Sequence, residues 1–92
     1  MITFLPLVMR LKQLHSQSDP EFQETWLIYE SSFPPDERQS KGAQKKRFGV
    51  RGYSWSAAVE GGQVIGMLEF WNFSGFSFVD HIAIADSHRN RG

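Results

Sequence analysis

The 92-residue sequence contains no cysteine and no long apolar run. Without cysteine there is neither a disulfide framework nor a thiolate metal site, and the histidines (His15, His81 and His88) are too scattered to suggest zinc. We therefore expect no metal site. No stretch approaches the roughly 18 apolar residues of a membrane span, and the apolar opening Met1–Met9 lacks the basic start and cleavage site of a signal peptide. A cytoplasmic protein with no membrane segment is expected.

The sequence also lacks net charge, because ten Lys and Arg balance ten Asp and Glu. This balance gives no global attraction to nucleic acid or to an anionic membrane. The charges are nevertheless uneven, since residues 38–51 contain six basic residues and no acid. A solvated helix or loop explains this basic run. Binding of single-stranded nucleic acid, with Phe48 and Tyr53 for stacking, is an alternative, but we expect no nucleic-acid partner.

What the sequence does contain is enough apolar material for one small domain, with eight Phe, three Trp and two Tyr. Imperfect alternation predicts a first strand over residues 8–14. Asp19, Pro20 and Glu21 then predict a helix start, because the Asp19 carboxylate can cap free N–H groups and proline suits the first turn. One face of that helix is aromatic, at helical spacing: Phe22, Trp26, Tyr29 and Phe33.

The two prolines at 34–35 end this helix, and a second short helix is predicted around residues 39–48. From Tyr53 onward β-branched and aromatic residues dominate, and Gly61-Gly62 and Ser74-Gly75 are turn signals. Three strands, joined as an antiparallel meander, are predicted over residues 53–59, 63–73 and 76–85.

This order of elements predicts an α/β fold of the layered α+β type: an N-terminal strand, one or two helices, and a three-strand antiparallel meander. The last two strands are apolar on both faces, so both sides of the sheet should be covered. The strand at 76–85 would form a long apolar edge, and a further strand is expected beside it.

Turn geometry pairs two carboxylates across the last hairpin. If Ser74-Gly75 is a two-residue loop, Phe73 opposes Phe76, and counting back places Glu69 opposite Asp80 on one face. Like charges so placed disfavour joint ionisation, so one carboxyl would have a raised pKa and could accept a proton from an ammonium substrate. Asp80 is the stronger candidate.

Three alternatives to that pairing stay open: a solvated strand acid, an ion-paired acid, or a bulge that breaks the register. Strand alternation places His81 on the opposite face from Asp80, where it would be a hydrogen-bonded core residue. The same strands hold several aromatic side chains that are either core or the lining of an acceptor pocket: Trp55, Phe70, Trp71, Phe73, Phe76 and Phe78.

The end of the chain carries the most specific motif. A hydrophobic strand runs into Arg89-Asn90-Arg91-Gly92, and inward-facing amides in such a loop make an anion nest to which arginine adds charge-assisted hydrogen bonds. The segment resembles the acetyl-CoA signature of GNAT-superfamily N-acetyltransferases, in which a strand leads into Arg/Gln-x-x-Gly-x-Gly/Ala and then a helix. Two other segments, residues 29–38 and Gly61–Gly66, are also similar to GNAT proteins.

The resemblance implies acetyl transfer from acetyl-CoA to a primary amine of a small molecule or peptide. It places Asn90, Arg91 and Gly92, with Arg89, at the pyrophosphate. It also implies a bulged strand whose main chain, at Ile82, Ala83 and Ile84, holds the pantetheine arm of acetyl-CoA.

Because only four of the six motif positions are present, residues 1–92 read as a single incomplete GNAT domain, in which residues 1–8 could be an extension. The activity of these 92 residues alone is therefore in doubt. The alternative is a non-catalytic GNAT-like half-domain that binds a partner, or forms a homodimer, through its open edge strand.

Overall fold

The computed structural model describes residues 9–88 and shows a single sheet with two helices. The elements follow in this order: β1 (Met9–Leu14), α1 (Phe22–Ser32), the 3-10 turn η1 (Pro35–Glu37), α2 (Lys41–Arg47), β2 (Tyr53–Glu60), β3 (Gln63–Phe73), β4 (Phe76–Ile84) and the 3-10 turn η2 (Asp86–His88). The predicted strand, two helices and three-strand meander are thus confirmed. The bounds of β3 match the predicted ones, and the other strands and α2 differ from their predicted bounds by at most two residues at either end.

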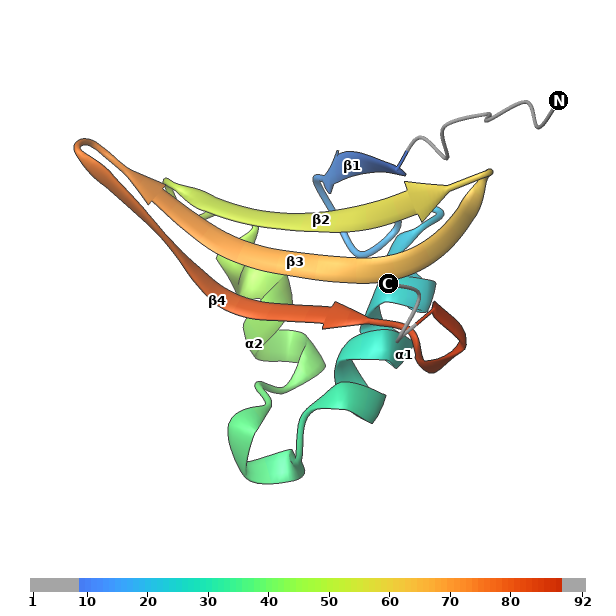
Figure 1. Cartoon of the computed structure of the whole chain (residues 1–92). Helices are drawn as coiled ribbons and strands as arrows, with labels where there is room; N and C mark the ends of the chain where they lie inside the picture. Colours follow the sequence, from blue (N-terminus) through green and yellow to red (C-terminus); the bar gives the residue numbers. More distant parts are fainter. Residues whose placement is uncertain (1–8, 89–92) are drawn as a thin grey trace, which may run out of the picture.

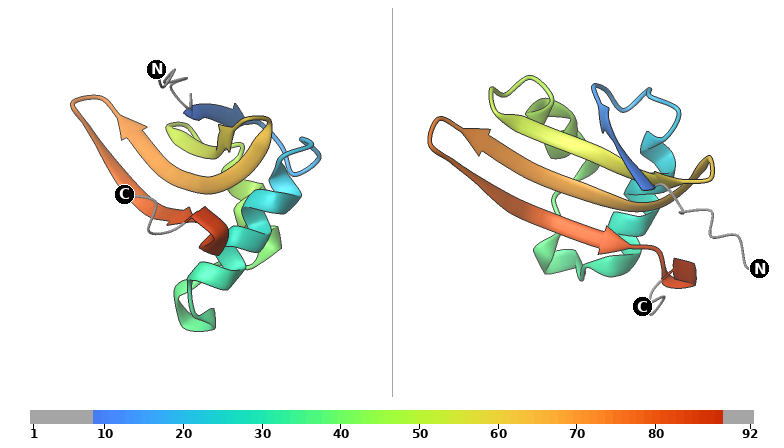
Figure 2. Two further views of the ribbon diagram at one scale, coloured as in Figure 1. Left: turned by 45° about the vertical axis from the view of Figure 1, so that its right-hand side comes forward. Right: turned by 45° about the horizontal axis from the view of Figure 1, so that its top comes forward.

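The four strands form one antiparallel sheet in the order β1-β2-β3-β4. Both helices lie against the same face of this sheet, below it in Figure 1, and Figure 2 shows the layered arrangement from two further sides. The α+β layered fold is therefore as predicted. Its two hairpin turns also match, because Gly61, Gly62 and Gly75 all have positive φ, at 57°, 78° and 92°.

The core forms between α1 and the helix-facing side of the sheet. The aromatic face predicted for α1 is buried there, with Phe22 1%, Trp26 5% and Tyr29 0% exposed. These three rings surround Trp55 of β2, at centroid distances of 5.6, 6.0 and 5.4 Å. The Trp55 indole donates to the Thr25 hydroxyl at 2.9 Å, so its one polar atom is satisfied in the core.

The predicted cap of α1 is wrong in detail. The carboxylate of Asp19 accepts hydrogen bonds from the N–H groups of His15 and Ser16, at 2.6 and 3.1 Å, rather than from the first turn of the helix. The helix begins at Phe22, and its first residues have no side-chain cap. Asp19 therefore stabilises the turn that leads from β1 into α1.

The expectation that both faces of the sheet are covered is wrong for the described residues. The helices cover one face only, and on the opposite face of β4 Val79 and Ile82 are 56% and 62% exposed. Among the described strands β4 is also the last in the sheet. The further strand expected beside it stays a prediction. No helix within residues 9–88 has the length and apolar character of a bilayer span.

Candidate functional site

A β-bulge in β4 creates the site. Phe73 opposes Phe76 as predicted, but the register shifts between Glu69 and Phe70, so that Phe70 pairs with Val79 and Glu69 with His81. Asp80 is the extra residue. The predicted pairing of Glu69 with Asp80 is therefore wrong by one position, and the alternative of a bulge that breaks the register is correct.

The bulge also corrects the predicted direction of His81. An extra residue interrupts the alternation of side chains, and as a result Asp80 and His81 both lie on the helix-facing side. His81 Nδ1 is 2.7 Å from Glu69 Oε1 and 3.7 Å from Asp80 Oδ1. The ring packs edge-on against Tyr29 and Phe33. His81 is hydrogen-bonded, as expected. It belongs to a cluster with Glu69 and Asp80, which we call the carboxylate cluster.

Glu69 is the buried centre of this cluster, with 0% exposure. Its Oε2 atom accepts from the Tyr53 hydroxyl at 2.6 Å, the Gln39 amide at 2.7 Å and Arg47 Nη1 at 3.1 Å. Burying a carboxylate is costly unless donors surround it, and here donors come from three different elements or loops. Glu69 is consequently inaccessible to a substrate in the described fold.

Asp80 is the accessible carboxylate, with its side chain 32% exposed. Its Oδ2 atom accepts from Arg47 Nη1 at 3.1 Å and from the Trp71 indole at 3.4 Å. Within residues 9–88 its Oδ1 atom accepts no hydrogen bond, the nearest ring nitrogen being that of His81. Oδ2 is thus held in place by two donors, whereas Oδ1 has no hydrogen-bond donor among the described residues.

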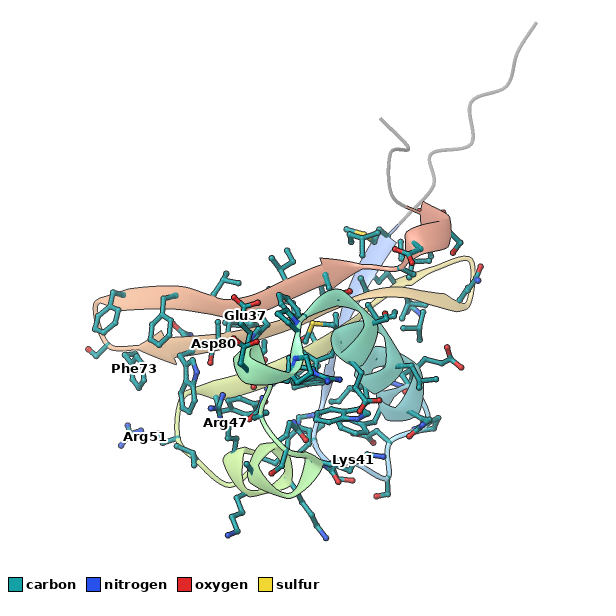
Figure 3. All side chains as sticks on the ribbon, turned by 90° about the horizontal axis from the view of Figure 1, so that it is seen from below. Glu37, Lys41, Arg47, Arg51, Phe73 and Asp80 are labelled. Atoms are coloured by element: carbon teal, nitrogen blue, oxygen red, sulfur yellow. The ribbon has the colours of Figure 1, made fainter. Side chains whose placement is uncertain are left out.

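Arg47 joins the two carboxylates, and Figure 3 shows it and Asp80 converging between α2 and β4. One guanidinium nitrogen contacts both Glu69 and Asp80, so a cation compensates their charges. Arg47 belongs to the basic run that the sequence predicts to be a solvated helix or loop, so the pattern does not indicate this role. No local signal could have found it, because the contacts join residues 22 and 33 positions apart.

His81 is held at both ring nitrogens. Nδ1 faces the Glu69 carboxylate, and Nε2 is 3.1 Å from the main-chain carbonyl of Glu37. Both neighbours are acceptor oxygens, so a ring N–H of His81 can donate to either of them. His81 therefore ties η1 to the sheet.

Tyr29 and Tyr53, which contact His81 and Glu69 respectively, are held in their neutral form. Burial, together with the hydrogen bond to Glu69, raises the pKa of Tyr53 far above its usual range. Burial also raises the pKa of Tyr29, whose hydroxyl accepts from the N–H of Gln39 at 2.8 Å. Tyr53 accordingly serves as a fixed hydrogen-bond donor.

The cluster has ligand atoms suited to a cation, which the sequence did not predict. Donor atoms of Glu69, Asp80 and His81 lie within 4.8 Å of one another. However, Arg47 already supplies a positive charge at the two carboxylates. The geometry is explained by an ion-paired network, and we assign no metal to it.

The strand that follows the bulge contains the proposed cofactor contacts. Ala85 donates its N–H to Ile65 of β3 at 2.7 Å, and the carbonyl of Ala83 also points toward β3, at Gly66. Because direction alternates along an antiparallel strand, the main chain of Ile82 faces the open edge. The loop Arg89, Asn90, Arg91 and Gly92 lies outside the described residues.

The structure does not support binding of single-stranded nucleic acid through stacking on Phe48 and Tyr53. Tyr53 is buried and Phe48 packs partly buried against the core, so neither ring is free to stack on a base.

No family model matches the sequence, and no curated protein sequence is similar to it. The structure, in contrast, is similar to that of a Bacteroides thetaiotaomicron protein assigned to the GNAT family of acetyltransferases, with a TM-score of 0.81 at 22% identity. The alignment covers 88% of this chain and 47% of the other, so the chain spans about half the length of that protein. At this identity the similarity establishes the fold, and the chain has part of the GNAT acetyltransferase fold.

Proposed function

We propose that the chain forms part of an N-acetyltransferase that transfers the acetyl group of acetyl-CoA to a primary amine. The partial GNAT fold supports the reaction class. The observation that carries the proposal is the bulge, which places the partly exposed carboxylate of Asp80 two residues before the open edge at Ile82. A proton acceptor and an exposed main chain are thereby adjacent on one strand.

Acetyl-CoA would supply a thioester whose carbonyl carbon the amine attacks, so that the C–N bond forms and the C–S bond breaks. On this proposal the outward main chain of Ile82 donates to the cofactor, with Ala83 and Ile84 continuing the strand. Arg89, Asn90, Arg91 and Gly92 would receive the pyrophosphate, a role that rests on sequence alone. Donors positioned in advance are an effective source of rate enhancement.

Asp80 is the proposed proton acceptor. An amine must lose its proton before it attacks, and a carboxylate within reach can receive that proton directly or through water. Asp80 has the free oxygen and the exposure for this role, whereas Glu69 has neither. We therefore propose Glu69 as a positioning residue that holds Arg47, which in turn orients Asp80.

The first prediction concerns Asp80. In Asp80→Asn, kcat/KM for acetylation should fall by about 10²–10⁴-fold, the usual contribution of a general base. Acetyl-CoA should raise the Tm of this variant as much as that of the parent. Thiol release during turnover measures kcat/KM and thermal-shift titration measures the change in Tm, on residues 1–92 and on the full-length gene product.

Asp36→Asn is the matched control, because it removes an exposed carboxylate from the neighbouring turn η1. Its activity should equal that of the parent. If acetyl-CoA shifts the Tm of neither residues 1–92 nor the full-length gene product, the proposed function is contradicted. Undiminished activity in Asp80→Asn would contradict the role of Asp80.

A further inference from the structure

Four aromatic side chains form a row on the helix-facing side of the β3–β4 hairpin. They are Trp71 and Phe73 of β3 and Phe76 and Phe78 of β4, and we call them the aromatic ladder. Cross-strand pairing joins Trp71 to Phe78 and Phe73 to Phe76. Neighbouring ring centroids are 5.4–6.5 Å apart, and the Trp71 and Phe73 planes differ by only 7°. The result is one continuous apolar surface.

The three phenylalanines of the aromatic ladder are exposed to solvent, unlike the aromatic residues of the core. Phe73, Phe76 and Phe78 are 40%, 61% and 46% exposed. The hairpin extends beyond both helices (Figure 1), so in the described residues neither helix covers its tip. An exposed cluster of large rings is unusual on a small domain and marks a contact surface.

Trp71, at the end of the aromatic ladder nearer the helices, contacts Asp80, the proposed proton acceptor. Trp71 donates its indole N–H to Asp80 at 3.4 Å, and the Arg47 guanidinium lies 5.8 Å from the Trp71 ring centroid. Arg47 is already engaged with both carboxylates. Arg47 contacts only Oδ2 of Asp80, and the Asp80 side chain is 32% exposed, so Oδ1 leaves this end of the apolar row an acceptor for the N–H groups of an ammonium.

The outer end of the aromatic ladder borders an open hollow of about 470 Å³, which is lined by Arg51, Asn72, Phe73 and Ser74. Hollows of this size suit small organic molecules. In Figure 3 Phe73 and Arg51 lie together at this end, and Asp80 lies toward the middle of the sheet. The aromatic ladder thus extends from this hollow to the Asp80 carboxylate.

We propose that the aromatic ladder binds the non-reacting part of the acceptor, and that the acceptor is a primary amine with an aromatic body. This inference rests on the proposed function. The ammonium would lie at Asp80 and the aromatic group against Phe78 and Phe76. Strands rise roughly 3.3 Å per residue, so the ring should be about 7–13 Å from the amine. A linker of several carbons satisfies that distance.

Charge and ring chemistry together favour this class. A polar amine would gain nothing from four rings, and an apolar molecule without a cation would gain nothing from Asp80. Aromatic groups stack on aromatic side chains with an additional gain beyond the area they bury. A molecule in which an ammonium is linked to an aromatic ring can contact Asp80 with the ammonium and the aromatic ladder with the ring.

The test compares 4-phenylbutylamine with n-butylamine, which has the same amine and no ring. Isothermal titration calorimetry should show that the chain binds 4-phenylbutylamine at least about tenfold more tightly. In the double variant Phe76→Ser/Phe78→Ser this preference should disappear. Val79→Ser is the matched control, because Val79 is 56% exposed on the same strand but on the opposite face, and it should keep the preference.

Equal binding of the two amines, or a preference that survives the double variant, would overturn the inference. So would a double variant that changes only the oligomeric state, since the aromatic ladder would then be an interface between copies. The acetyl-CoA thermal shift is measured separately. If 4-phenylbutylamine binds as expected but acetyl-CoA does not, the proposed function fails while the aromatic ladder remains an amine-binding surface.

Discussion

At the scale of single residues, Glu69 shows how a buried charge is stabilised here. It is fully buried, and four side chains contact its carboxylate. Removing one partner of such a network leaves part of the desolvation cost uncompensated, which is why single substitutions have large effects. The network also determines where Asp80 lies, because Arg47 binds both carboxylates.

Tyr53→Phe tests this network. The substitution keeps the ring in place and removes the hydroxyl that donates to Glu69 at 2.6 Å. The free energy of unfolding should fall by about 1–3 kcal/mol, as measured by urea denaturation. Ser77→Ala removes an exposed hydroxyl and should change it by less than about 0.5 kcal/mol. Equal effects of the two substitutions would show that the Tyr53 hydroxyl contributes nothing specific.

At the scale of elements, the turn between β1 and α1 depends on an ionised carboxylate. Hydrogen bonds from the N–H groups of His15 and Ser16 hold the pKa of Asp19 below its usual range. A carboxyl whose pKa is lower in the folded than in the unfolded state stabilises the fold above the unfolded value. That stabilisation is lost as the pH falls through the lowered pKa.

Asp19→Asn should therefore lower Tm at neutral pH, and the difference from the parent should shrink as the pH falls below about 4. The asparagine oxygen can still accept a hydrogen bond, but it has no charge to lose. Thermal unfolding followed by circular dichroism from pH 7 to pH 3 measures the difference. A difference in Tm that is the same at every pH would contradict the argument.

At the scale of the whole molecule, the described residues leave β4 at an edge with an apolar outer face. Such edges pair with other chains when nothing protects them. Leu68 pairs with Ile82 and Phe70 with Val79 on this face, so the apolar surface extends over two strands. A homodimer through β4 remains a proposal that follows from this edge.

Ile82→Lys should reduce any self-association of residues 1–92, because a charge at the edge opposes strand pairing. Sedimentation velocity at increasing concentration is the measurement. Leu27→Lys, on α1 and 47% exposed, adds the same charge away from the edge and should leave association unchanged. If both variants associate like the parent, β4 is not the interface.

The sequence by itself was enough to predict the elements and their order. The aromatic spacing of α1, the prolines after it and the two turn signals are local features, and each predicted element is present in the structure. The pairing of Phe73 with Phe76 followed from the turn alone. The resemblance to GNAT proteins, carried by a short loop and two segments, agrees with the fold that the structural comparison shows.

The tertiary structure decided the site. No glycine or proline marks the bulge at Asp80, so the sequence placed Asp80 one position out of register and His81 on the wrong face. The partners of Glu69 come from α2, β2 and the segment before α2, which only packing brings together. Local patterns specify where the chain turns and which faces are apolar, whereas the geometry of a buried polar network depends on contacts between residues distant in sequence.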